Sequence, residues 1–301
     1  MTGLRGVWPG RAAGGTDVTE AVEIFEVGPR DGLQNEARPI PVPEKVALID
    51  CLGRAGFRRI EVASFVSPKW VPQMASSGEV LAEITRVPGI SYAALTPNLK
   101  GFEAALAAGA DEVAIFASAS EGFSRANLNA TIAESLARFA PVAAAARAAG
   151  VPVRGYVSCV VECPYDGPVA PEAAARAAAA LSELGVYEVS LGDTIGQGTP
   201  EAVDAMLTRV LEEMPPTRLA GHFHDTSGRA LENVEVALER GLRVFDAAVG
   251  GLGGCPYAPG AKGNVATEAV AERLAELGYA TGLDRAVLAE AAAMARAMRA
   301  G

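Results

Sequence analysis

Residues 153–191 read VRGYVSCVVECPYDGPVAPEAAARAAAALSELGVYEVSL and contain one complete structural unit. The β-rich segment Val153–Ser158 leads through a polar loop into an Ala-rich helical stretch, which ends at Gly185, just before the β-rich segment Tyr187–Leu191. Gly185 marks a helix end, because glycine accepts the left-handed conformation that closes a helix. A strand, a helix and a second strand in this order predict a βαβ unit with parallel strands.

The same unit recurs along the chain from residue 22 onward. The other strand candidates are Val22–Val27, Arg59–Ala63, Ile90–Leu95, Glu112–Phe116, Arg218–Phe223 and Val244–Val249, and the other helical stretches end at Gly56, Gly109, Gly150 and Gly241. Eight strands spaced by about 30 residues predict a closed (β/α)₈ TIM barrel rather than an open doubly wound sheet. Residues Thr267–Ala300 are expected to form a C-terminal helical extension.

Length and composition allow one large globular domain or two ordinary ones. The chain has 301 residues, of which 50% are hydrophobic, enough to fill a sizeable core. Residues 1–20 are rich in Gly and small side chains, and Pro9 interrupts any amphipathic helix, so we expect a flexible N-terminal tail there and a single barrel domain over residues 21–301. No secretory or membrane-spanning segment is recognisable, and we predict a reduced, cytoplasmic protein.

The charge excludes some partners. The formal net charge is −10, from 26 basic and 36 acidic residues, and no run of five Lys or Arg occurs. Duplex binding needs a basic stripe that replaces the counterions on phosphates, so nucleic acid is not expected as a partner. An anionic small molecule is compatible with this charge if a few Arg and Lys side chains converge locally.

The two histidines of the chain, His222 and His224, lie in one predicted strand. Side chains alternate along a strand, so these two point to the same side, about 6.6 Å apart along the backbone. Two imidazoles placed in this way can bind one metal ion, and in a TIM barrel the end of a strand is where chemistry takes place. We therefore predict a metal site, although packed histidines are the simpler alternative.

Asp31, at the end of the first strand, is the best candidate for an anionic ligand, and the amide oxygen of Asn264 can supply a fourth. The first strand of a closed barrel lies one strand away from the seventh, so the side chains can converge. Two imidazoles with carboxylate and amide oxygens suit Mg²⁺ or Mn²⁺, with Zn²⁺ chemically possible. The alternatives are loop capping by Asp31 and helix capping by Asn264.

Arg30 precedes Asp31 and can polarise a carbonyl or stabilise an enolate. The alternative, an ion pair with Glu61 or Asp193, is compatible with that role, since Glu61 at the rim can hold Arg30 in position. Cys255 lies in a glycine-rich loop that matches neither a dinucleotide fingerprint nor a Walker A motif. We interpret this loop as a lid and Cys255 as a group for proton transfer or nucleophilic attack.

The other cysteines are expected to be structural. Cys51 is predicted to be a small buried group in the helix after the first strand. If the stretch between Cys159 and Cys163 is extended, the two residues are about 13 Å apart, too far to share a metal or form a disulfide.

Five segments, in this order, resemble the hydroxymethylglutaryl-CoA lyase family over about residues 22–285. They are GPRDGLQNE (28–36), SFVSPKWVPQM (64–74), SLGDTIG (190–196), HFHDT (222–226) and GGCPYAPGAKGNVATE (253–268). The resemblance implies a TIM barrel that cleaves 3-hydroxy-3-methylglutaryl-CoA to acetyl-CoA and acetoacetate with a divalent cation, as in leucine degradation and ketone-body formation. It also implies a homodimer.

The resemblance assigns roles to individual residues. It implies metal ligation by Asp31, His222, His224 and Asn264, and contact of Arg30 with the thioester carbonyl. It implies catalysis by Cys255 and supporting or catalytic roles for Glu61, Asp193 and Glu268. For removal of the proton from the C3 hydroxyl of the substrate there are two candidate bases, His222 and Asp31, and the sequence does not choose between them.

Some positions depart from the family pattern: Phe223, Ser227, Lys262 and Ala269. Phe223 should face away from the metal by strand alternation, whereas Lys262 and Ala269 leave the preferred acyl group open. We expect Lys69 and Lys262 to receive the CoA phosphates, with solvated surface charge as the alternative.

Two other functions stay open: a sibling barrel lyase or synthase for another 3-hydroxyacyl-CoA or oxo-acid, and a non-catalytic, metal-stabilised binding module. Two histidines and one carboxylate also bind iron in Fe(II) oxygenases, but the loop cysteine and the order of the motifs argue against that class.

Overall fold

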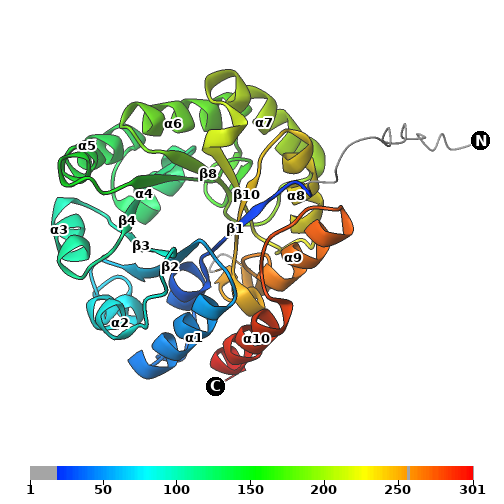
Figure 1. The fold of residues 1–301 in the computed structure, drawn as a ribbon. Coiled ribbons are helices and arrows are strands. Elements are labelled where there is room, and N and C mark those ends of the chain that lie inside the picture. Colours follow the sequence, from blue (N-terminus) through cyan, green and yellow to red (C-terminus); the bar gives the residue numbers. More distant parts are fainter. Residues whose placement is uncertain (1–18, 256–257, 301) are drawn as a thin grey trace, which may run out of the picture.

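The computed structural model describes residues 19–255 and 258–300. Eight parallel strands close into a barrel in the order β1-β10-β9-β8-β5-β4-β3-β2, which confirms the predicted TIM barrel (Figure 1). The strands are β1 (Glu23–Glu26), β2 (Arg59–Ser64), β3 (Ser91–Leu95), β4 (Glu112–Ser118), β5 (Val153–Ser158), β8 (Glu188–Asp193), β9 (Leu219–Phe223) and β10 (Val244–Ala247).

Helices surround the barrel on the outside (Figure 1). They are α1 (Val42–Arg54), α2 (Ser77–Glu83), α3 (Leu99–Ala107), α5 (Ile132–Ala149), α6 (Pro171–Glu183), α7 (Pro200–Glu213) and α8 (Ala230–Glu239). The glycines predicted to end helices all have positive φ, between 69° and 97°. The expected C-terminal extension consists of α9 (Thr267–Glu276) and α10 (Arg285–Ala300), and α10 packs against α1. Among the described helices, none is long and apolar enough to cross a membrane.

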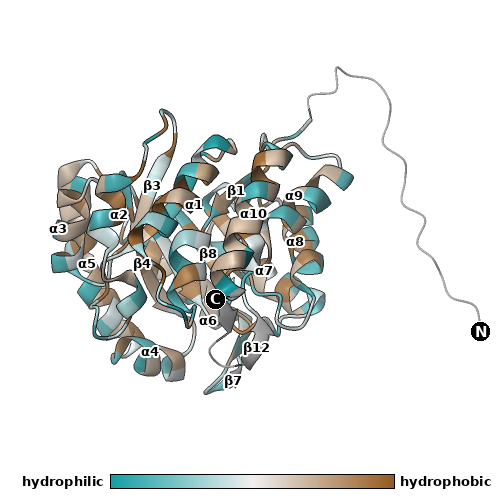
Figure 2. Cartoon of the chain, turned by 90° about the horizontal axis from the view of Figure 1, so that it is seen from below, coloured by the Kyte–Doolittle hydropathy of each residue, from teal (hydrophilic) through white to brown (hydrophobic). Residues whose placement is uncertain are grey.

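The loops at the carboxyl ends of the strands contain elements that the sequence pattern did not reveal. They are the π-helical turn η1 (Gly28–Gly32), helix α4 (Glu121–Leu128), the hairpin β6 (Glu162–Cys163) and β7 (Gly167–Pro168), and the hairpin β11 (Gly254–Cys255) and β12 (Ala258–Lys262). Figure 2 shows α4, β7 and β12 at the same end of the barrel. These additions build the walls around the end where TIM barrels carry their active sites.

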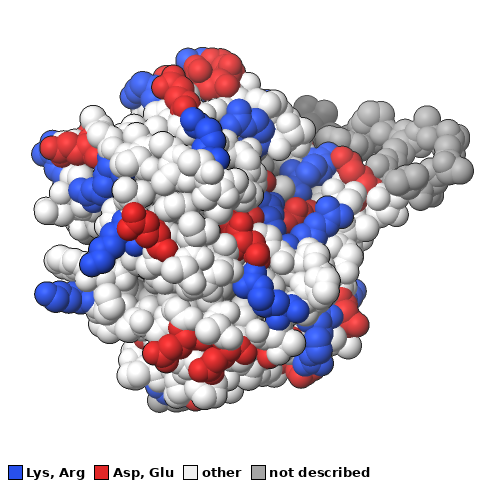
Figure 3. Space-filling view, turned by 60° about the vertical axis from the view of Figure 1, so that its left-hand side comes forward, with Lys and Arg blue, Asp and Glu red and all other residues white. Residues whose placement is uncertain are grey.

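Strand alternation divides the side chains between two environments. Outward-facing residues form the main hydrophobic core with the helices, and Phe223 belongs to this core, as predicted. The barrel interior instead contains charged groups: Arg154 is 1% exposed and makes ion pairs with Glu188 and Asp246. On the outer surface shown in Figure 3, acidic and basic side chains are interspersed, and neither sign forms a continuous patch.

One geometric assumption about the cysteines was wrong. The stretch from Cys159 to Cys163 is not extended, because Cys159 has a φ of 58° and turns the chain. Both cysteines pack with Phe123 in one small buried cluster. Their thiols are free, like that of Cys51, which is buried in α1 as expected. The predicted tail lies outside the described residues, except for Thr19 and for Glu20, which accepts a hydrogen bond from Arg243 at 2.7 Å.

Candidate active site

A cavity of about 720 Å³ opens among the loops that follow the barrel strands. Its buried lining includes Arg30, Tyr156, His222 and His224. Its lining also includes Trp70, which is 83% exposed. The cavity therefore extends from charged groups inside the barrel to an exposed aromatic side chain.

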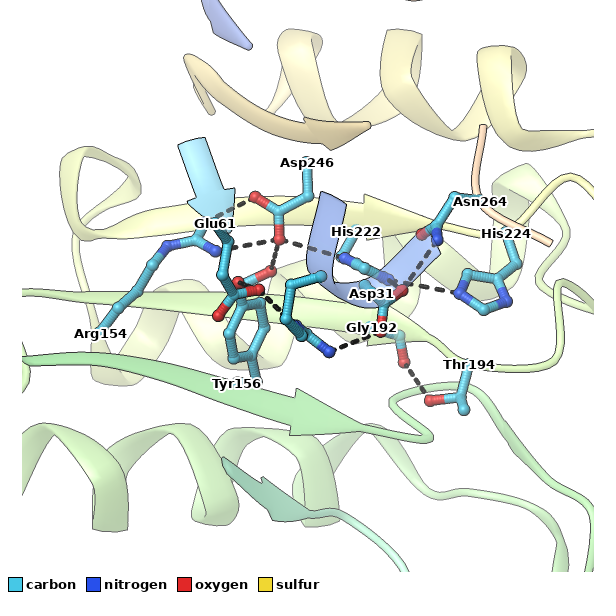
Figure 4. A network of polar contacts seen from close by, with 12 residues as sticks. Asp31, Glu61, Arg154, Tyr156, Gly192, Thr194, His222, His224, Asp246 and Asn264 are labelled. Carbon is cyan, nitrogen blue, oxygen red and sulfur yellow. Dashed lines mark hydrogen bonds and ion pairs between the residues drawn. The ribbon is translucent and has the colours of Figure 1, made fainter. Parts of the chain in front are cut away.

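The two histidines of β9 and its continuation converge with Asp31 of η1 (Figure 4). The Nε2 atoms of His222 and His224 are 3.3 Å apart, and Oδ2 of Asp31 lies 3.9 Å from Nε2 of His222. One ligand atom from each of the three residues lies within 4.8 Å of the others. The predicted convergence of these three side chains is thus present in the structure.

Asp31 is held as a carboxylate. Its Oδ1 atom accepts hydrogen bonds from Arg30 at 2.7 Å and Gln34 at 3.0 Å, and its Oδ2 atom accepts one from the Asn264 amide at 2.8 Å. Burial by itself would raise the pKa of Asp31, but the Arg30 guanidinium, the two histidines and Asn264 together lower it to about 2. Asn264 does not cap a helix, because α9 begins three residues later, at Thr267.

The donor set fits a divalent cation. A carboxylate oxygen and two imidazole nitrogens point toward one another, and the Asn264 amide lies beside them. Burial and the proximity of His222 lower the pKa of His224 to about 4, which keeps this imidazole neutral and able to donate a lone pair. Oxygen and imidazole ligands together suit a divalent metal ion.

Arg30 lies beside this group and is held on two sides. Its Nε atom donates to Oε2 of Glu61 at 2.6 Å, and its guanidinium lies 5.5 Å from the centre of the Tyr156 ring. The Tyr156 hydroxyl donates to the same Glu61 oxygen at 3.1 Å, while Oε1 of Glu61 has no partner among the described residues. The ion pair weighed for Arg30 therefore exists with Glu61, and it orients the guanidinium next to Asp31.

The carboxylates of Asp193 and Glu268 accept hydrogen bonds from backbone amides, and neither residue lines the cavity. Asp193 accepts hydrogen bonds from the amides of Gln197 at 3.2 Å and Gly198 at 2.8 Å. Glu268, in the first turn of α9, accepts one from the Gly250 amide at 3.0 Å and lies 3.3 Å from Arg296. These contacts shape the loops after β8 and β10, so both residues are placed to support the site.

Of the three remaining expected site residues, the structure describes Lys69 in full and Cys255 and Lys262 in part. Lys69 is exposed in the loop after β2, between the cavity-lining residues Ser67 and Trp70. The backbone of Cys255 and Lys262 lies in β11 and β12, but their side chains lie outside what the structure describes.

Sequence reasoning missed the polar groups that face inward from the middle of the strands. Tyr156 lines the cavity, and Asp246 of β10 lies 3.1 Å from Nδ1 of His222. The missed signal was polar residues inside predicted strands: Arg154 and Tyr156 are two positions apart on β5, so they face the same side.

The chain resembles characterised proteins over most of its length. It is 57% identical over 275 residues to the 3-hydroxy-3-isohexenylglutaryl-CoA/hydroxy-methylglutaryl-CoA lyase of Pseudomonas aeruginosa, covering 91% of this chain and 92% of the relative. Its fold matches the crystal structure of the HMG-CoA lyase from Brucella melitensis with a TM-score of 0.93 and 61% identity, covering 94% and 100% of the two chains.

A further solved structure adds a ligand. The HMG-CoA lyase from Acinetobacter baumannii, in complex with coenzyme A and 3-methylmalate, matches with a TM-score of 0.89 and 38% identity, covering 95% of this chain and 93% of that one. The model of the HMGL-like family matches residues 21–295, and with these relatives it shows that the chain belongs to the HMGL-like family.

Proposed function

We propose that this protein is a divalent-cation-dependent carbon–carbon lyase that cleaves 3-hydroxy-3-methylglutaryl-CoA to acetyl-CoA and acetoacetate. The observation that carries this proposal is the convergence of Asp31, His222 and His224 beside the buried Arg30 in the cavity. Family membership and the activity of the relatives support the same reaction.

The cation would be held by Asp31, His222, His224 and Asn264, and Mg²⁺ or Mn²⁺ suits these ligands best, with Zn²⁺ chemically possible. When bound, it would supply Lewis acidity that lowers the pKa of the C3 hydroxyl of the substrate.

Cleavage needs a base for that hydroxyl proton. Both oxygens of Asp31 already accept hydrogen bonds, and its pKa of about 2 makes it a weak base. His222 has a raised pKa, because Asp246 and Asp31 more than compensate for the lowering by burial. Its Nδ1 atom faces Asp246 and its Nε2 lone pair would be held by the cation, so the imidazole cannot bind the cation and accept the proton at the same time. We therefore keep both ligands, His222 and Asp31, as candidates for the base.

The electron pair of the O–H bond forms the ketone of acetoacetate, the C2–C3 bond breaks, and its electrons remain on the acetyl thioester as an enolate. Arg30 would stabilise the enolate oxygen, because its guanidinium remains charged and is fixed by Glu61. A proton from Cys255 would then complete acetyl-CoA, since an ordinary thiol with a pKa of about 8.5 is protonated at neutral pH. In this scheme Asp193 and Glu268 are positioning residues.

The CoA moiety would occupy the outer part of the cavity, past Trp70, and Lys69 and Lys262 would receive its phosphates. The cavity volume of about 720 Å³ suits a ligand of this size, and the Acinetobacter relative contains coenzyme A.

A second substrate is favoured by one observation. The Pseudomonas aeruginosa relative is named for two substrates, one of them with a longer isohexenyl branch at C3. Lys262 and Ala269 depart from the family pattern, and we propose the longer-branched thioester as a second substrate of this chain. A panel of 3-hydroxyacyl-CoA thioesters with increasing branch length distinguishes the two by kcat/KM.

A coupled assay of acetyl-CoA release from 3-hydroxy-3-methylglutaryl-CoA tests the proposal. We expect turnover that EDTA abolishes and that excess Mg²⁺ or Mn²⁺ restores. Stable metal binding without turnover on any thioester of the panel would instead indicate a binding module.

We also infer a homodimer and a cytoplasmic location. Family resemblance supports the homodimer, and light scattering should give twice the chain mass of 30.8 kDa. The free thiols of Cys51, Cys159 and Cys163 and the bacterial relatives support the location.

A further inference from the structure

The two histidines of the site differ in what holds their outer nitrogen atoms. Nδ1 of His222 lies 3.1 Å from Oδ2 of Asp246, and both side chains are buried. Nδ1 of His224 is also buried but has no hydrogen-bond partner among the described residues. Among the described residues, a carboxylate therefore orients the imidazole of His222 through Nδ1, whereas Nδ1 of His224 has no such partner.

The partners of Asp246 fix the direction of its bond to His222 (Figure 4). Arg154 donates to both carboxylate oxygens, at 2.7 and 3.0 Å, and the Ser190 hydroxyl donates to Oδ2 at 2.7 Å. A carboxylate that faces a guanidinium and a hydroxyl donor in this way is ionised and can only accept. The hydrogen between Asp246 and His222 must therefore be on Nδ1 of the imidazole.

Arg154 is itself fixed, so Asp246 cannot move away easily. Its Nε atom donates to Glu188 at 2.7 Å, and its guanidinium lies 4.3 Å from the ring centre of Phe25 and 4.9 Å from that of Tyr156. The Tyr156 ring also packs edge-on against the His222 imidazole, with centroids 6.2 Å apart. The side chains around His222 thus form a rigid, fully buried support.

We propose that Asp246, held by Arg154 and Ser190, is a positioning residue that fixes His222 in the Nδ1–H tautomer. The lone pair of His222 then lies on Nε2, which faces His224 and Asp31. A carboxylate that accepts from the outer nitrogen of a metal-binding histidine orients the ring and makes it a better ligand. This inference rests on the proposed metal-dependent function only where metal affinity is concerned, because the tautomer exists without a metal.

The chain suits a direct test, because His222 and His224 are its only histidines. Long-range ¹H–¹⁵N NMR of protein with ¹⁵N-labelled histidine, recorded without metal at alkaline pH, should show two rings, and the variant His224→Gln assigns them. We expect His222 to have its proton on Nδ1. A proton on Nε2 of His222 in the unmodified protein overturns the proposal, whatever any variant does.

The variant Asp246→Asn tests the role in metal binding. An amide N–H facing Nδ1 moves the proton to Nε2, so we expect Mn²⁺ affinity, measured by electron paramagnetic resonance, to fall about 10- to 100-fold. The matched control is Glu23→Gln, which removes a carboxylate that pairs with Arg59 at 2.7 Å in the barrel interior without touching Asp246. The control should change neither the tautomer nor the Mn²⁺ affinity.

A folded Asp246→Asn protein with unchanged Mn²⁺ affinity and an unchanged His222 spectrum contradicts the proposal. If that variant does not fold, Ser190→Ala removes one donor to Asp246 without leaving a buried charge unpaired, and it should weaken Mn²⁺ binding a few-fold. Failure of the unmodified protein to bind Mn²⁺ would count against the proposed lyase function, whereas the metal-free spectrum would still decide the tautomer.

Discussion

Arg30 and Glu61 form a buried ion pair in which a single carboxylate oxygen, Oε2, lies 2.6 Å from Nε and 2.5 Å from Nη2 of the guanidinium. The pair joins the π-helical turn η1 to β2, two elements separated by about thirty residues in the chain. It leaves Nη1 of Arg30 for Asp31, at 2.7 Å. The position of Arg30 is therefore set by Glu61, and that of the Asp31 carboxylate in part by Arg30.

Arg30→Lys should lower kcat about 10²- to 10³-fold and change KM little. An ammonium lacks the planar fork by which the guanidinium contacts Glu61 through two nitrogens and Asp31 through a third, so the charge that stabilises the enolate is misplaced. Steady-state kinetics of acetyl-CoA release measure this. The control Arg59→Lys alters a guanidinium that pairs with Glu23 and Glu188, and it should lower thermal stability while leaving kcat unchanged.

His224→Gln should weaken Mn²⁺ binding at least tenfold, because it removes a neutral imidazole whose Nε2 faces the other ligands. Equilibrium binding followed by electron paramagnetic resonance measures the change. Phe223→Leu is the matched control: its side chain belongs to the core between strands and helices, so stability should fall while Mn²⁺ affinity is retained. Equal losses of affinity in both variants would show that the effect is not ligation.

The barrel could be predicted because its signals are local and repeated. The five helices that close at the predicted glycines, all with positive φ, lead into strands, and the boundaries of the eight strands were predicted to within two residues. The π-helical turn at Gly28–Gly32 and the left-handed Cys159 could not be predicted, because residues of these types adopt such conformations only in a particular tertiary context.

The ligand group could be predicted in part, from alternation along one strand and from the closure of the barrel. His222 and His224 share a strand face by alternation, and the closed barrel brings Asp31 near them. Asp246 was not predicted, because its role depends on pairing with Arg154, which is 92 residues away in sequence and meets it only inside the closed barrel. Polar residues at inward positions of strands are therefore worth weighing together with the strand-end residues.

Gly32→Ala should destabilise the protein by about 1–3 kcal/mol and weaken Mn²⁺ binding. A Cβ at this position would lie 2.6 Å from Cβ of Leu252, so η1, with Asp31, must shift. Urea unfolding and Mn²⁺ titration measure the two effects. In the control Gly78→Ala, within α2, a new Cβ meets nothing within 4 Å, and both quantities should be unchanged or stability slightly higher.

Lys69→Gln should raise KM for the acyl-CoA several-fold with little change in kcat, and it should reduce the salt dependence of KM, because an exposed ammonium acts on phosphates through a screened field. Kinetics at two ionic strengths measure this. Arg58→Gln removes an exposed cation just before β2, at the opposite end of the barrel, and should have no effect. A KM that does not depend on ionic strength in the unmodified protein would contradict the assignment.

The stability of the protein should fall as the pH rises from about 4.5 to 7, in part because of Glu26. Its Oε1 atom accepts from the amides of Gly28 at 2.8 Å and Val249 at 2.9 Å, and Oε2 contacts the Thr267 hydroxyl at 2.6 Å. Burial raises the pKa of Glu26 to about 7 despite these contacts. The folded state therefore binds a proton that the unfolded chain has already lost, so the stabilisation is complete below pH 4.5 and disappears above pH 7. A shift of this size corresponds to about 3 kcal/mol.

Glu26→Gln keeps one acceptor for the two amides and supplies a donor for Thr267, so the free energy of unfolding of this variant should depend less on pH. Urea unfolding at pH 5 and pH 8 measures the free energy of unfolding of both proteins. Relative to the unmodified protein, the variant should be more stable at pH 8 than it is at pH 5. If the difference in free energy between the two proteins is the same at both pH values, Glu26 does not titrate in this range.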